Sequence, residues 1–124
     1  MNFLEAIKSG FSNYINFSYR ASRSEHNYWI LFTMLVALIV QIIEWDLIMN
    51  NEFAPIDGIT NMIFLLPNWS IAVRRLHDLN KSGWNILWIF TIIGLIPLFY
   101  WCYLIPGNKG DNPYGSDPLS EQLL

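Results

Sequence analysis

Charged side chains are scarce in this sequence. Asp, Glu, Lys and Arg together account for 14% of its 124 residues, against a usual share of roughly 25% in soluble domains. Apolar residues account for 53%. A soluble domain of this size could not bury so much apolar surface and still present a charged exterior to water. The composition therefore favours a membrane protein with a single domain, residues 1–124.

Cysteine and catalytic motifs are nearly missing as well. Cys102 stands alone, which excludes an internal disulfide and a cysteine-based metal cluster. Phosphate-binding loops, dinucleotide fingerprints and zinc patterns do not occur. Metal ligands are scarce, since the only histidines are His26 and His77. No serine or cysteine is placed to complete a triad with His77 and Asp78, which do not face each other on a helix. We therefore expect no metal, no cofactor and no enzyme activity.

Three long apolar runs dominate what is present. A helix of roughly 20 residues crosses a hydrocarbon core of about 30 Å, and aromatic side chains near the ends of the runs are typical of membrane–water boundaries. The predicted transmembrane helices cover residues 27–47, 58–75 and 84–105. The fold class expected is thus all-α, an integral membrane protein with three transmembrane helices.

The basic residues indicate an orientation. Six of the seven lie before the first run or between the second and the third, and the loop between the first two runs has none. The positive-inside rule places the basic segments in the cytoplasm of a bacterial inner membrane. The amino terminus is then cytoplasmic and the carboxyl terminus periplasmic. Nucleic-acid binding is disfavoured, because the basic residues are few and lie against the membrane.

The third apolar run could form a re-entrant hairpin instead of a transmembrane helix. Gly94 and Pro97 lie near its middle, and proline interrupts helical hydrogen bonding. If the chain reverses at Gly94–Pro97, the run is a re-entrant hairpin and the tail returns to the cytoplasm. Such irregular backbone must be covered by protein or water.

The two ends of the chain have their own patterns. Within residues 1–25, apolar side chains recur at helical spacing, which predicts an amphipathic helix lying on the cytoplasmic leaflet or on the ends of the bundle. Residues 106–124 are rich in Gly, Pro, Asn and Asp, which predicts solvent-exposed turns.

Two short polar segments at the cytoplasmic boundary form the candidate site. Arg74 or Arg75 can pair with Asp78 on one helix, and Glu25 can pair with another arginine. A break at Ser82–Gly83 would bring Trp84 to the interface. The residues of this cluster are Arg20, Arg23, Glu25, Arg74, Arg75, His77, Asp78, Ser82, Gly83 and Trp84.

These segments resemble those of the bacterial family known as domain of unknown function 805, the YhaH-like inner-membrane proteins. The resemblance rests on R-A-S-R-x-E at 20–25, R-R-L-H-D at 74–78, S-G-W at 82–84, I-P at 96–97 and a glycine-rich tail at 110–118. Tyr19, His26 and Asn27 depart from the usual pattern around the first segment. The resemblance implies a multi-pass inner-membrane protein and supplies no activity.

The arginines have two readings. They can simply hold loops inside, since each juxtamembrane Lys or Arg gains about 1 kcal/mol at an anionic leaflet. Alternatively they form a site that clamps a lipid phosphate or an acidic partner segment. The function expected is a scaffold or accessory factor that engages lipid head groups or a membrane-protein partner, including a second copy. A small subunit of a transport assembly is the alternative, and an enzyme acting on lipid head groups is the third.

Overall fold

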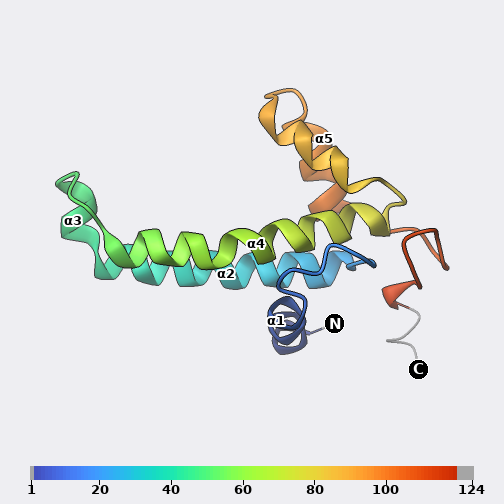
Figure 1. The fold of residues 1–124 in the computed structure, drawn as a ribbon, viewed down its shortest axis with the longest axis horizontal. Coiled ribbons are helices and arrows are strands. Elements are labelled where there is room, and N and C mark those ends of the chain that lie inside the picture. Colours follow the sequence, from blue (N-terminus) through green and yellow to red (C-terminus); the bar gives the residue numbers. More distant parts are fainter. Residues whose placement is uncertain (1, 120–124) are drawn as a thin grey trace.

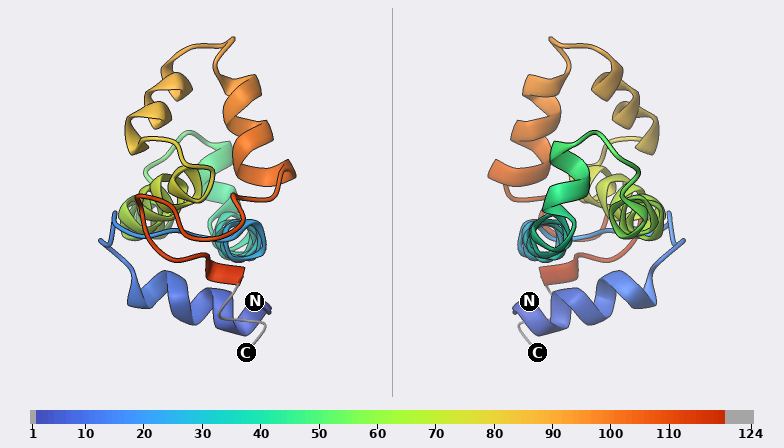
Figure 2. Two further views of the ribbon diagram at one scale, coloured as in Figure 1. Left: turned by 90° about the vertical axis from the view of Figure 1, so that its right-hand side faces the viewer. Right: turned by 90° about the vertical axis from the view of Figure 1, so that its left-hand side faces the viewer.

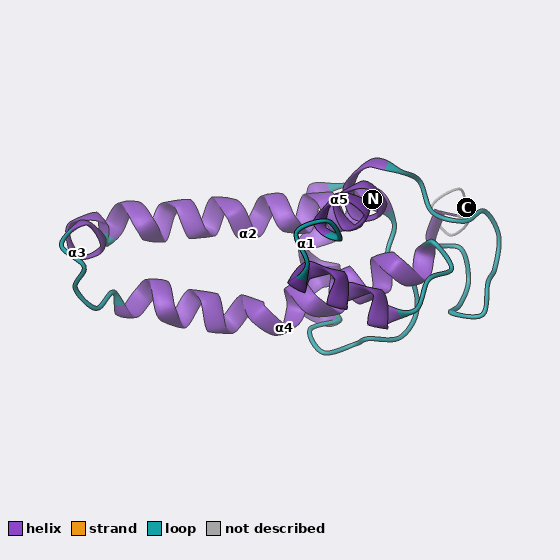
Figure 3. Ribbon diagram, turned by 90° about the horizontal axis from the view of Figure 1, so that it is seen from above, coloured by secondary structure: helices purple, strands orange, loops and turns teal. Residues whose placement is uncertain are grey.

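Two long antiparallel helices form the framework of the structure. The computed structural model describes residues 2–119. Within this range α2 (Arg23–Ile43) and α4 (Pro55–Asp78) run side by side and are joined at one end by the short α3 (Trp45–Met49), as Figures 1 and 3 show. Regular structure in 2–119 is helical, apart from an isolated bridge between Asn112 and Gly115. The all-α prediction is confirmed for the described residues.

The ends of this long hairpin are set by local signals. The Ser22 side chain accepts a hydrogen bond from the Glu25 amide and caps α2. Pro55 begins α4, where its missing N–H is not needed. The Glu44 carboxylate, at the end of α2, accepts hydrogen bonds from the amides of Ile56 and Asp57 at 3.2 and 2.7 Å. Glu44 therefore closes α2 onto the start of α4, and the predicted 27–47 helix ends earlier, at Ile43.

Helix α1 (Phe3–Ser12) confirms the predicted amino-terminal helix. Asn2 and Glu5 cap it reciprocally, side chain to backbone. It packs on both long helices through Phe11, whose ring meets that of the fully buried Trp29 edge-on at 5.2 Å. Gly10 permits this approach, since a Cβ atom there would lie 2.1 Å from the Trp29 ring.

The third apolar run is not one helix, so the prediction of a continuous helix over 84–105 is wrong. It forms the 3₁₀ helix η1 (Gly83–Phe90), then reverses, then continues as α5 (Leu95–Phe99) and the π-helical turn η2 (Tyr100–Leu104). The Thr91 hydroxyl donates to the Trp88 carbonyl and accepts from the Gly94 amide. A Cβ atom on Gly94 would lie 2.3 Å from Thr91 Oγ1, so glycine is required there. Pro97 falls in the first turn of α5, where it removes no helical bond.

The elements form three layers. The short hairpin of η1, α5 and η2 lies on one side of the α2–α4 pair and α1 lies on the other, as the end-on views of Figure 2 show. Of the described helices, α2 has the length and apolar composition of a membrane span, with mean hydropathy 1.7, while Leu95–Leu104 is apolar but shorter.

Candidate functional site

A buried ion cluster lies at the end of the long hairpin where α2 begins and α4 ends. The Asp78 carboxylate is shared by two arginines, with Oδ1 3.0 Å from Arg20 Nε and Nη2 and Oδ2 2.7 Å from Arg75 Nη1. Their side chains are at most 3% exposed. Burial raises the pKa of the Asp78 carboxyl, and the two guanidinium groups oppose that rise. The predicted pairing of Arg75 with Asp78 is confirmed.

Arg74 has a different partner from the one expected on helical spacing alone. Its Nη1 lies 3.2 Å from Glu25 Oε1, which also accepts a hydrogen bond from the Ser9 hydroxyl of α1. The predicted pair with Asp78 is therefore wrong for Arg74, because α4 turns this side chain toward α2. Its Nε and Nη2 are buried with no hydrogen-bond partner among the described residues.

The arginines also hold the end of the short hairpin. Arg75 donates from Nε to the Cys102 carbonyl at 3.2 Å and from Nη2 to the Ile105 carbonyl. Arg23 Nη1 donates to the Leu104 carbonyl at 2.7 Å. These are the carbonyl groups that a helix leaves unsatisfied at its carboxyl end, where cations are favoured. The cluster thus caps η2 and fixes it against α2 and α4.

Arg20 holds the described part of the tail in the same way. Its Nη1 donates to the Gly110 and Gly115 carbonyls at 2.6 and 3.3 Å, and its Nη2 donates to the Asn108 carbonyl. The Asn108 amide in turn donates to the Asp78 carbonyl at 2.7 Å. The described tail consists largely of turns with exposed residues, as predicted, and it docks on the arginine end of the hairpin. Residues 120–124 of the predicted tail lie outside the described range.

His77 joins this docking surface. Its Nδ1 donates to the Tyr19 carbonyl at 2.9 Å, and its ring stacks on Tyr114 at 4.1 Å with an interplanar angle of 6°. The Asn112 side chain donates to the His77 carbonyl. Burial lowers the pKa of His77, and the bond to Tyr19 opposes that change. His77 is thus a packing and hydrogen-bonding residue.

The predicted break after α4 is also present. The Ser82 side chain accepts a hydrogen bond from the Trp84 amide at 3.3 Å and caps η1. A Cβ atom on Gly83 would lie 2.7 Å from Val73, so the glycine lets η1 start close to α4. Trp84 is 78% exposed. Ser82, Gly83 and Trp84 therefore turn the chain and take no part in the ion cluster.

Burial decides what the cluster can do. Arg20, Arg74 and Arg75 are at most 6% exposed and bind groups of the protein itself. A buried ion pair is weak evidence of stability, yet breaking one by removing a single partner costs about 3–5 kcal/mol. The structure thus uses these three arginines for contacts within the protein. Arg23 remains exposed.

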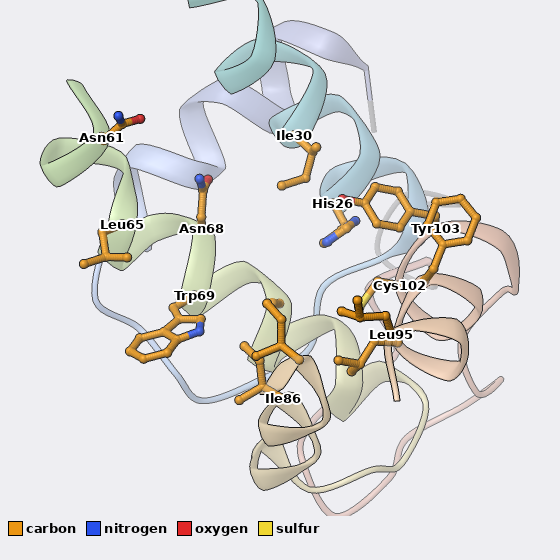
Figure 4. A pocket seen from close by; sticks show the side chains of 14 residues that line it. His26, Ile30, Asn61, Leu65, Asn68, Trp69, Ile86, Leu95, Cys102 and Tyr103 are labelled. Atoms are coloured by element: carbon orange, nitrogen blue, oxygen red, sulfur yellow. The ribbon is translucent and has the colours of Figure 1, made fainter. Parts of the chain in front are cut away.

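A cavity of about 680 Å³ lies between the long and the short hairpins, and its polar residues were not predicted as a site. Figure 4 shows His26 on α2, Asn68 on α4 and Tyr103 on η2 around it. The sequence did contain a signal for this site, because Asn61 and Asn68 lie inside an apolar run. Burying such polar side chains in a membrane costs free energy, so their presence there suggests a functional role.

The comparisons with known proteins agree with the membrane assignment. Residues 14–116 match the family described as "Protein of unknown function (DUF805)". The chain is 36% identical to Inner membrane protein YhaI of Escherichia coli (strain K12) over 108 residues, covering 86% of this chain and 88% of that protein. It is 32% identical to Inner membrane protein YhaH of the same strain over 124 residues, covering 88% and 92%. No solved structure gives a significant match. The relatives YhaI and YhaH are inner membrane proteins. The chain therefore belongs to the DUF805 family.

Proposed function

We propose that this protein is a non-enzymatic accessory factor of the inner membrane that gathers anionic lipid at its cytoplasmic face. In this proposal α2 and α4 span the bilayer, and the short hairpin enters from the cytoplasmic side and returns. The docked tail carries the proposal, because Arg20 and Asp78 bind residues 108–115 at the end where α2 begins and α4 ends. Both α1 and the tail then lie on the cytoplasmic side of the membrane.

The charge distribution supports this topology. With the tail docked, all seven basic residues lie toward the end of the long hairpin that holds the ion cluster. They are Lys8, Arg20, Arg23, Arg74, Arg75, Lys81 and Lys109. The connection at the other end carries acidic residues and no basic ones, namely Glu44, Asp46, Glu52 and Asp57. The positive-inside rule favours a cytoplasmic ion cluster and a periplasmic α3.

The surface of the short hairpin supports its insertion. The last residue of η1, Phe90, and two residues of the turn that follows, Ile92 and Ile93, are 75%, 87% and 83% exposed. Such a contiguous apolar tip is unfavourable in water. Contact with lipid tails removes that penalty, and the arginines at the base supply the backbone partners that irregular chain needs inside a membrane.

In this proposal the basic residues outside the buried ion cluster bind the lipid head groups. Lys8 on α1 and Lys109 in the tail are exposed, and neither forms an ion pair with a residue in the range 2–119. Lys81 lies 4.5 Å from the centre of the Trp101 ring. Each basic side chain at an anionic surface contributes about 1 kcal/mol. Together they make a small positive face.

Cysteine labelling in intact cells tests the topology. In a Cys102→Ala background, we expect Glu52→Cys to react with a membrane-impermeant maleimide from outside. Lys8→Cys and Lys109→Cys should react only after the membrane is permeabilised. Labelling of Lys109→Cys in intact cells would show that the third run crosses the membrane and would overturn the docked-tail topology.

Lipid analysis of the purified protein tests the binding function. The Lys8→Gln/Lys109→Gln variant should retain less phosphatidylglycerol than the parent, because two surface charges are lost. The Asp46→Asn/Glu52→Asn variant, altered at the acidic end, is the matched control and should retain the parental amount. Equal retention by both variants would contradict the proposal.

A further inference from the structure

The cavity between the hairpins has the character of a ligand pocket. Its volume of about 680 Å³ lies within the usual range for small-molecule sites, which combine apolar walls with a few polar groups. No charged side chain is among the residues that line it. The apolar wall comes from four elements, and its main members are Ile30, Leu65, Trp69, Ile86, Leu95 and Leu98.

His26 presents a hydrogen-bond acceptor to this cavity. The Asn27 Nδ2 donates to the Tyr103 carbonyl at 3.1 Å, which fixes the orientation of the Asn27 amide. Asn27 Oδ1 therefore faces His26 Nδ1 at 3.2 Å, and Nδ1 must carry the proton of the neutral ring. Nε2 is left with a lone pair and has no partner within residues 2–119, although His26 is only 3% exposed. Figure 4 shows the ring pointing into the open space.

Asn68 presents a donor from the facing helix. Trp29 Nε1 donates to Asn68 Oδ1 at 2.8 Å, which fixes this amide as well. Its Nδ2 group makes no hydrogen bond to any residue from 2 to 119. Polar groups left unpaired in apolar surroundings cost free energy, so a ligand that pairs with them gains from doing so.

We propose that this cavity binds a neutral lipid that carries a hydroxyl group. The hydroxyl donates to His26 Nε2, the Asn68 amide offers a further hydrogen bond, and the hydrocarbon chain lies along the apolar wall. A neutral head group follows from the absence of charged lining residues, since an unpaired ion would not be accommodated there. This site is separate from the positive cytoplasmic face, and either can fail without the other.

Binding of tritiated farnesol to the purified full chain in dodecyl maltoside tests the proposal. Farnesol combines a flexible hydrocarbon chain with one hydroxyl, and its methyl ether has the same chain without the donor. We expect the ether to compete about tenfold less well than unlabelled farnesol, the effect of one buried hydrogen bond. Failure of farnesol to bind, or equal competition by the ether, would overturn the proposal.

Substitutions locate the site. His26→Phe keeps a ring but removes the acceptor, so it should weaken farnesol binding about tenfold and abolish the preference over the ether. His26→Gln restores an acceptor and should recover part of that preference. Ala72→Phe fills the cavity and should weaken both ligands, whereas Leu38→Phe, on the exposed face of α2, should weaken neither.

Circular dichroism of each variant checks that its helices are intact. Farnesol binding that survives both His26→Phe and Ala72→Phe would show that the ligand lies elsewhere, which contradicts the proposed site. The His26 variant tests the hydrogen bond, and the Ala72 variant tests the volume of the cavity. If one variant misfolds, the other still tests whether farnesol binds in this cavity.

Discussion

The Tyr14 hydroxyl donates a hydrogen bond to the Ile63 carbonyl, the one that α4 itself cannot satisfy. In a regular helix the N–H of residue 67 would bond to the carbonyl of residue 63, but Pro67 has no N–H. Helix α4 nevertheless continues to Asp78. The segment that follows α1 thus completes the hydrogen bonding of α4. In the topology proposed above, this carbonyl lies in the bilayer, where an unpaired carbonyl costs several kcal/mol.

Removal of this hydroxyl should destabilise the protein in a way that depends on Pro67. We expect Tyr14→Phe to lower the free energy of unfolding by about 1–3 kcal/mol, because in the proposed topology it leaves the Ile63 carbonyl unpaired in hydrocarbon. In a Pro67→Ala background the alanine N–H can bond to Ile63, so the same change should cost little. Unfolding in dodecyl maltoside by added dodecyl sulfate measures both.

Tyr28→Phe is the matched control for this prediction. Tyr28 is partly exposed and its hydroxyl makes no hydrogen bond to any of the described residues, so its loss should change stability by less than about 0.5 kcal/mol. An identical cost of Tyr14→Phe with and without Pro67 would show that the hydroxyl acts in some other way.

Gly107 is predicted to be irreplaceable in the docked tail. A Cβ atom there would lie 1.8 Å from Asp78 Oδ2 and 2.8 Å from the Asp78 carbonyl oxygen. Gly107→Ala should therefore displace Asp78 from Arg20 and Arg75 or detach the tail. We expect a loss of about 1–3 kcal/mol, as for other overpacked sites, and faster proteolysis of the tail.

Gly58→Ala provides the comparison for Gly107. Nothing lies within 4 Å of a Cβ atom on Gly58, which is inside α4. Alanine is the better helix former by roughly 1 kcal/mol, so this change should stabilise the protein slightly. If both alanine variants behaved alike, the contact between Gly107 and Asp78 would not be the cause.

The sequence predicted those features whose signals are local. Long apolar runs predicted α2 and α4, periodic apolar side chains predicted α1, and the Ser82–Gly83 break predicted the start of η1. The Arg75–Asp78 pair spans three residues. The pairs of Arg20 with Asp78 and of Arg74 with Glu25 join residues 58 and 49 positions apart. Spacing on a single helix carries no information about such pairs.

The third run shows a second limit. Its hydropathy suits one crossing helix as well as two short helices back to back, because both bury apolar side chains in lipid. The reversal depends on the Thr91 hydroxyl and on the space left by Gly94. The docking of the tail depends on backbone carbonyls, which every residue has and no composition reveals.

Docking of the tail should weaken in mild acid because of His77. Burial holds the pKa of His77 below its usual value of 6.5, so the ring is neutral when it stacks on Tyr114. Well above pH 6.5 both the folded and the unfolded state are neutral, and the contribution to stability is complete. As the pH falls below that value the unfolded state binds a proton first, so stability declines.

Unfolding measured between about pH 7.5 and about pH 5.5 checks this prediction. His77→Phe can stack on Tyr114 but cannot titrate, and it should therefore show a smaller loss of stability over the same interval. Its overall stability should be lower, because the bond to the Tyr19 carbonyl is lost. A pH dependence unchanged in His77→Phe would assign the effect to another group.

The tip of the short hairpin should tolerate no charge if it lies in the hydrocarbon. Ile92 is 87% exposed and lies in the turn between η1 and α5. A lysine deep in the bilayer costs about 2.5–3.5 kcal/mol, and less where the side chain can reach the interface. In bilayers we expect Ile92→Lys to lower stability or membrane-inserted yield, and Glu52→Lys, in the α3–α4 connection, to change neither. In detergent without a bilayer core of fixed depth the difference should shrink. A neutral effect of Ile92→Lys in bilayers would place the short hairpin outside the hydrocarbon.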